Sequence, residues 1–170
     1  LLIGHSTTGT LDAATYNNGV GFGALEALTS GDQNNCLGNN AGKLIDTGRY
    51  NNVMGNNAAQ ALTSGQQNVL LGGGAAFHNG TGLYNTIVGN NAAWGVTGNS
   101  NSGNTALGYY ALQYIETGGN NIAIGRQAGD NITTGNGNVV IGRADVSSAT
   151  GDDQLSISDG EDGSVVWMTG

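Results

Sequence analysis

One short pattern returns along nearly the whole chain: asparagine, two further residues, an aliphatic residue and then glycine. It is clearest at Asn121–Gly125, NIAIG. Successive glycines of this pattern, which we call marker glycines, are 17 residues apart except for one step of 19. A fixed period of this length is typical of a solenoid in which each repeat forms one coil. The marker glycines are Gly4, Gly21, Gly38, Gly55, Gly72, Gly89, Gly108, Gly125 and Gly142.

Asparagine occupies position −4, counted from the marker glycine, in every repeat that contains this position. Stacked coils bring these amides together, and each can bond to the same amide on the next coil. We therefore predict a structural asparagine ladder through the solenoid. Its members are Asn17, Asn34, Asn51, Asn68, Asn85, Asn104, Asn121 and Asn138.

The composition favours an all-β solenoid over helices. The chain has 32 glycines among 170 residues and no proline. A helix of 12 or more residues would contain one or two glycines and several asparagines, each costing up to about 1 kcal/mol against alanine. Short strands that end at glycine fit the pattern better. We expect about eight coils of 17 residues in one repeat domain, residues 1–144.

Two columns of apolar residues flank each other in the expected strand. Position −1 is aliphatic or Met, and position −2 is never polar. Neighbouring strand residues point to opposite faces, so we expect position −1 to face the coil interior and position −2 to face outward. An outward apolar column predicts burial against other chains. The expected interface residues are Val53, Leu70, Ile87, Ala106, Ala123 and Val140.

The copies NTALGYYALQYIETGGN (Asn104–Asn120) and NIAIGRQAGDNITTGNG (Asn121–Gly137) resemble repeats of bacteriophage tail fibres. They are also similar to the shorter repeats in the head of YadA-type trimeric autotransporter adhesins. The resemblance covers about residues 1–144. It implies a left-handed parallel β-roll, an intertwined homotrimer and a role in attachment. The 17-residue period favours the phage fibre over the adhesin head.

For a fibre, the resemblance implies location in the virion tail, contact with other virion tail proteins, and a host-cell surface glycan or protein as receptor. The adhesin alternative implies the bacterial cell surface. A third class, a polysaccharide-degrading β-solenoid, requires paired carboxylates near a groove. The acids of residues 1–144 are isolated in sequence, so we expect no enzyme, no catalytic residue and no cofactor.

Aromatic residues gather in consecutive repeats beside the 19-residue step. Exposed aromatic faces often bind sugars, so this cluster is the candidate receptor-binding patch. The alternative is aromatic packing at the seam between subunits. The residues are Phe77, His78, Trp94, Tyr109, Tyr110 and Tyr114.

Two further features are expected to be structural. Tyr16, Tyr50 and Tyr84 share position −5 and alternate with Gln33 and Gln67, so each ring has room to lie over its smaller neighbour. The two extra residues of the long repeat lie in GNSNSGN, residues 98–104, which is a surface loop or a receptor contact.

Charge and composition limit the partners. The formal net charge is −8, and no cluster of Lys and Arg is present, so neither nucleic acid nor an anionic membrane surface is expected as a partner. No apolar run approaches the roughly 18 residues of a membrane span. The single cysteine, Cys36, is expected to be a buried thiol, and the two histidines have no Cys or Asp at ligand spacing, so no metal site is predicted.

The 17-residue period ends after Arg143. Residues 145–170 contain six of the twelve acids and read as two strands, QLSIS and SVVWM, separated by DGEDG. We expect this segment to be a separate acidic C-terminal β-hairpin that caps the solenoid.

Overall fold

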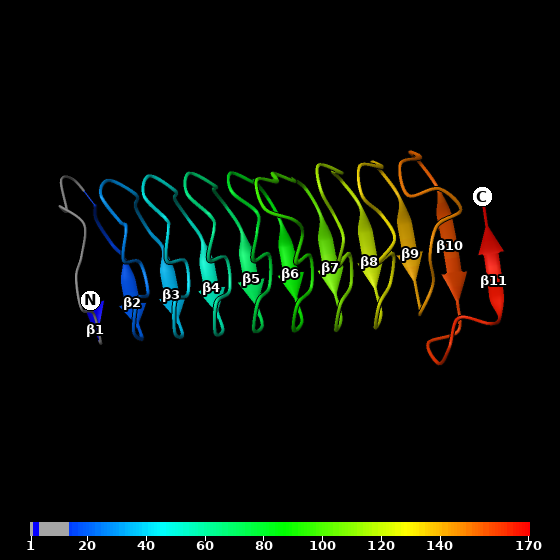
Figure 1. Ribbon diagram of the computed structural model, residues 1–170, viewed down its shortest axis with the longest axis horizontal. Coiled ribbons are helices and arrows are strands. Elements are labelled where there is room, and N and C mark those ends of the chain that lie inside the picture. Colours follow the sequence, from blue (N-terminus) through cyan, green and yellow to red (C-terminus); the bar gives the residue numbers. More distant parts are fainter. Residues whose placement is uncertain (1, 4–13) are drawn as a thin grey trace.

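The computed structural model describes residues 2–3 and 14–170, so the marker Gly4 lies outside the described part. The chain forms a parallel β-solenoid in which each coil adds one short strand to a single sheet. Figure 1 shows the coils stacked along the long axis of the molecule, with the two chain ends at opposite ends of the stack. The all-β class, the absence of helix in the described residues and the stack of about eight 17-residue coils agree with the sequence prediction.

The sheet has eleven strands in chain order, and β1 to β10 are parallel neighbours. The register joins like positions, for example Val53↔Leu70 and Met54↔Leu71 between β4 and β5. The strands are β1 (Leu2–Ile3), β2 (Asn18–Val20), β3 (Asn35–Leu37), β4 (Asn52–Met54), β5 (Val69–Leu71), β6 (Thr86–Val88), β7 (Thr105–Leu107), β8 (Ile122–Ile124), β9 (Val139–Ile141), β10 (Leu155–Ser158) and β11 (Val166–Thr169).

The rest of each coil consists of turns, and backbone hydrogen bonds join neighbouring coils there too. In the turn after β3, Gly42 N donates to Ala58 O at 2.9 Å, and Leu44 N donates to Gln60 O at 3.2 Å. The marker glycine is needed at the corner because Gly55 has φ 139° and a Cβ there would collide with the carbonyl oxygen of Gly72. Coils can therefore approach to backbone contact at this corner.

The asparagine ladder is present and buried. Asn51 Nδ2 donates to Asn34 Oδ1 at 2.9 Å and to Gly65 O at 2.8 Å. The same two bonds recur at Asn68, with Asn51 Oδ1 and Gly82 O as acceptors. Each amide thus satisfies both the neighbouring coil and a turn carbonyl, which is what a polar group inside the solenoid requires.

The strand faces are opposite to those expected from the sequence. The predicted interface residues are buried in the core of a single chain: Val53, Leu70, Ile87, Ala106, Ala123 and Val140 are each at most 2% exposed. The reason is the period of two along a strand. Position −4 is buried by the ladder, so position −2 points to the same side and positions −3 and −1 point outward.

Position −1 instead forms an apolar column of exposed and half-buried residues on the outer face of the sheet, which we call the outer stripe. Exposure reaches 45% at Leu37, 50% at Met54 and 49% at Leu107. The described members are Val20, Leu37, Met54, Leu71, Val88, Leu107, Ile124 and Ile141. The inference that one apolar column faces outward holds, but it applies to the neighbouring column.

The 19-residue coil supplies a hydrogen-bond partner for a polar core residue of the coil before it. Asn79 replaces the usual aliphatic residue at position +7 and is 2% exposed. Its Nδ2 donates to Asn101 O at 3.0 Å, and its Oδ1 accepts from Gly82 N at 2.9 Å. Asn101 comes from the 98–104 segment and is also buried, while Gly98 and Ser100 are exposed. The insertion is therefore partly internal.

The solenoid continues one coil beyond the predicted boundary at residue 144. β10 pairs in parallel with β9, and Gln154 takes the place of the ladder asparagine, with its N and Nε2 donating to Asn138 Oδ1 at 2.9 and 3.1 Å. Only then does β11 return antiparallel to β10 as the last strand of the sheet. The tail is thus an extra coil followed by an edge strand.

Candidate receptor-binding surface

The six predicted aromatic residues lie on the three consecutive coils that contain β5, β6 and β7. Among the described residues, their rings make contact in two groups. In the first, Phe77 and Trp94 stack with centroids 4.3 Å apart and planes 8° apart. The His78 ring meets both edge-on, 4.6 Å from Phe77 and 5.7 Å from Trp94. All three residues are partly exposed.

This first group is packed within one chain. The Trp94 ring lies over Gly74, where a Cβ would come within 2.5 Å of Trp94 Cζ3. Partial burial lowers the pKa of His78. Thr97 Oγ1 lies 3.4 Å from its Nδ1. The stack is formed by adjacent coils without any partner chain, so packing between subunits is not required to explain it.

The second group is Tyr109 and Tyr110, whose rings are 4.0 Å apart and tilted by 54°. The interaction between the two phenol groups raises the pKa of Tyr109 and lowers that of Tyr110, and the Asn91 side chain also lowers the pKa of Tyr110. Tyr109 is 47% exposed and Tyr114 is 52% exposed. These two rings are the members most available to a receptor.

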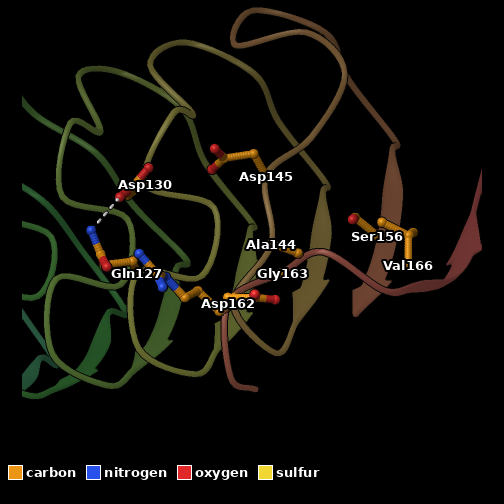
Figure 2. A pocket seen from close by; sticks show the side chains of 9 residues that line it. Gln127, Asp130, Ala144, Asp145, Ser156, Asp162, Gly163 and Val166 are labelled. Carbon is orange, nitrogen blue, oxygen red and sulfur yellow. Dashed lines mark hydrogen bonds between the residues drawn. The ribbon is translucent and has the colours of Figure 1, made fainter. Parts of the chain in front are cut away.

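The sequence did not reveal a cavity where the last coils meet the C-terminal loop. Its volume is about 410 Å³, and it is lined by residues that follow β8 and β9 and by residues 162–163. Figure 2 shows Asp130 bonded to Gln127, with Asp145 on the neighbouring coil and Asp162 arriving from the loop before β11. Asp130 and Asp145 are 15 residues apart, close to one coil, and this near-period spacing was the signal in the sequence.

The Asp145 carboxyl influences the protonation of Asp130. Burial is the main cause that raises the pKa of Asp130 to about 6, and the nearby Asp145 carboxyl adds to it, opposed by Gln127 and Arg143. Asp145 also accepts from the backbone N–H of Asn131 at 3.3 Å. Near pH 6 the pair therefore holds a proton that an ordinary aspartate would have lost.

The described residues contain neither a reactive cysteine nor a cluster of metal-ligating side chains. Cys36 is buried, and this burial raises the pKa of its thiol to about 12. No group of three or more His, Cys, Asp and Glu side chains that could hold a metal ion occurs in residues 14–170. The part of the chain that the structure describes also contains no helix long and apolar enough to cross a membrane.

Comparison with protein-family models, with curated proteins and with solved structures finds no match to this chain. Its function is therefore inferred from its own repeat pattern and geometry.

Proposed function

We propose that this chain is a non-enzymatic, structural and host-attachment segment of a bacteriophage tail fibre that works as a homotrimer. The observation that carries the proposal is the outer stripe, which runs along the sheet from β2 to β9. A soluble protein rarely leaves such a continuous aliphatic surface in water. Three copies meeting along their outer stripes would bury it.

The tail coil gives independent support for a buried outer face. In β10 the inward residues are Ser156 and Ser158, at 3% and 2% exposure, whereas Leu155 and Ile157 lie on the outer face. A strand with one solvated face normally places its apolar residues inward. The opposite arrangement here extends the apolar surface toward the C-terminus, where Ile157 pairs with Met168 of β11.

The repeat architecture suits a fibre mechanically. Each coil is joined to the next by the sheet, by turn hydrogen bonds and by the asparagine ladder, so bending would break bonds on several sides of the coil at once. Such a body is a stiff rod. A rod with exposed tyrosines near its middle is suited to holding a receptor contact away from the virion.

Two other functions use parts of the same structure. A bacterial adhesin head would need the same stripe and rod, and the 17-residue period favours the fibre only through resemblance. A polysaccharide-degrading enzyme would need two carboxyl groups roughly 5 Å or 6.5–9.5 Å apart across the scissile bond. Asp130 and Asp145 are the neighbouring carboxyl groups that such an enzyme would use, but Asp130 is half-buried and its carboxyl accepts a hydrogen bond from Gln127.

Attachment can be tested with fluorescently labelled protein on a panel of intact bacterial strains. Tyr109→Ala should reduce retention on a susceptible strain and leave the melting temperature within a few degrees of wild type, because the ring is 47% exposed. Trp94→Ala should lower stability by about 1–3 kcal/mol, because a stacked and partly buried ring is lost. Unchanged retention of a folded Tyr109→Ala, Tyr114→Ala double variant would contradict the receptor assignment.

A further inference from the structure

Tyr16, Tyr50 and Tyr84 form an exposed column on alternate coils. Their exposures are 82%, 49% and 61%. The sequence predicted that each ring has room to lie over the smaller residue of the adjacent coil, and about half or more of the surface of each tyrosine remains exposed. Gln33 and Gln67 stand between them in the same column.

These tyrosines occupy a backbone conformation that disfavours them. Their φ angles are 57°, 58° and 60°, in the left-handed region. Later coils place Asn120 or glycine at this position, as expected where φ is positive. A side chain with a Cβ is disfavoured in this conformation. Since Tyr16 and Tyr84 are mostly exposed and Tyr50 is half exposed, burial alone does not explain why tyrosine stands at this position three times.

A shallow groove runs beside the column. Its volume is about 510 Å³, and it is lined by Tyr16, Gln33 and Tyr50 on one side and by Asn18, Asn35 and Asn52 on the other. The three asparagines bond to one another, Asn18 Nδ2 to Asn35 Oδ1 at 2.7 Å and Asn35 Nδ2 to Asn52 Oδ1 at 3.1 Å. The lining contains phenol and amide groups and no charged side chain.

The charged neighbours of the groove neutralise each other. Arg49 Nε lies 3.9 Å from Asp32 Oδ2, next to Tyr50 and Gln33 in sequence. Hydrogen bonds from Thr15 hold the pKa of Asp32 low, with Arg49 contributing less. The groove therefore offers aromatic faces and neutral hydrogen-bonding groups, the combination that fits an uncharged polyhydroxylated ligand.

We propose that this groove and the Tyr84 ring beyond it form a track for an extended, uncharged β-linked polysaccharide chain. Coils stack about 5 Å apart, so alternate coils place the rings about 10 Å apart. In an extended β-1,4-linked chain, the length of one sugar unit is close to the spacing between two coils. Along the solenoid, every second sugar would therefore lie against a tyrosine ring, and the intervening sugars would lie against Gln33 and Gln67. The track rests on the proposed attachment function and supplies the chemical class of its ligand.

The test is isothermal titration calorimetry of the 170-residue protein with chitohexaose and cellohexaose, and with maltohexaose as a curved α-linked comparison. At least one β-linked hexasaccharide should bind, and maltohexaose should bind at least tenfold more weakly. The triple variant Tyr16→Asn, Tyr50→Asn, Tyr84→Asn should lose at least tenfold in affinity. Its melting temperature should not fall, because asparagine tolerates positive φ, as Asn120 shows in the same column.

Phe22→Asn is the matched control, because Phe22 is an exposed aromatic at position +1, where Asn39 and Asn56 stand in the next coils. It should bind like wild type. The track is overturned if neither β-linked sugar binds, or if the triple variant binds as well as wild type. It is equally overturned if the triple variant changes the oligomeric state, which would make the column a subunit contact. Retention on cells by a chain that binds no sugar would leave the attachment function standing.

Discussion

Adjacent residues of one type can have different roles in this chain, and Asn51 and Asn52 show this most clearly. Asn51 is fully buried, and its Oδ1 accepts from the backbone N and the Nδ2 of Asn68 at 3.2 and 2.9 Å. Asn52 is exposed on the outer face and accepts one bond from Asn35 at 3.1 Å. The same side chain is thus structural at one position and part of a surface groove at the next.

Asn51→Ala should destabilise the chain by about 3 kcal/mol, because it leaves buried donors of Asn68 and the carbonyl of Gly65 without their partner. Asn52→Ala should change stability by no more than about 0.5 kcal/mol, as exposed substitutions usually do. Urea denaturation of the two variants measures the difference. Equal midpoints would show that the ladder contributes little to stability.

The marker glycines make a second prediction at this scale. Gly55→Ala should cost about 3 kcal/mol or more, because a Cβ adds a collision with Gly72 to an unfavourable positive φ. Gly98→Ala, where φ is also positive but no atom lies within 4 Å, should cost only about 1–2 kcal/mol. Thermal melting of the two variants separates the cost of the steric collision from the cost of backbone strain alone. A smaller loss of stability for Gly55→Ala than for Gly98→Ala would contradict the close contact between coils at the corner.

The sequence predicted the ladder correctly because amide repetition has few other uses in a solenoid. It assigned the strand faces wrongly because both positions −1 and −2 are apolar, so hydrophobicity alone does not distinguish inside from outside. The ladder itself contained the answer, since a buried position −4 places position −2 on the same side. The positive φ of Tyr16, Tyr50 and Tyr84 could not be read from residues that normally avoid it.

At the scale of elements, the last coil departs from the repeat and brings titratable groups together. Asp130 follows β8, Asp145 follows β9, and the loop before β11 adds Asp162, with Arg143 as the nearby cation. The sequence placed a boundary at residue 144 because the marker glycine is lost there. Gln154 continues the ladder with glutamine in place of asparagine, so the repeat pattern did not reveal the extra coil.

The Asp130–Asp145 pair predicts a pH dependence of stability. The folded pKa of Asp130, about 6, exceeds its ordinary value of 3.8, so the folded state holds the proton more tightly than the unfolded state. The stability that this group contributes is fully present below pH 3.8 and is lost as the pH rises to about 6. Asp145→Asn removes the neighbouring charge but leaves the burial of Asp130, so it should reduce this loss in part.

The measurement is the melting temperature of wild type minus that of Asp145→Asn, followed from about pH 4 to about pH 7. The difference should fall as the pH rises. Subtraction is needed because Asp32 and Asp162 have lowered pKa values and contribute the opposite trend, losing stability as the pH falls. A difference that is constant with pH would show that Asp145 does not raise the pKa of Asp130.

For the whole molecule, the outer face of the sheet changes character along the rod. Near the N-terminus the stripe is bordered by the polar side chains of Asn18, Asn35 and Asn52, whereas in the last coils Ile122 and Val139 widen it. The N-terminal half therefore offers a groove for a polar ligand beside the stripe, and the C-terminal half offers a broader apolar surface. Copies of the chain are expected to associate most tightly toward the C-terminal end.

The central claim is that copies meet through the outer stripe, and sedimentation of two neighbouring variants tests it most directly. The wild-type chain of 17.0 kDa should sediment as a folded trimer of about three times that mass. Met54→Asp places a charge on the stripe, and it should weaken the trimer while the β circular dichroism of the coil persists. Val53→Asp, one residue away and 2% exposed, should instead unfold the coil. A wild-type chain that stays monomeric and folded at all concentrations, or a Met54→Asp trimer as stable as wild type, would contradict the account.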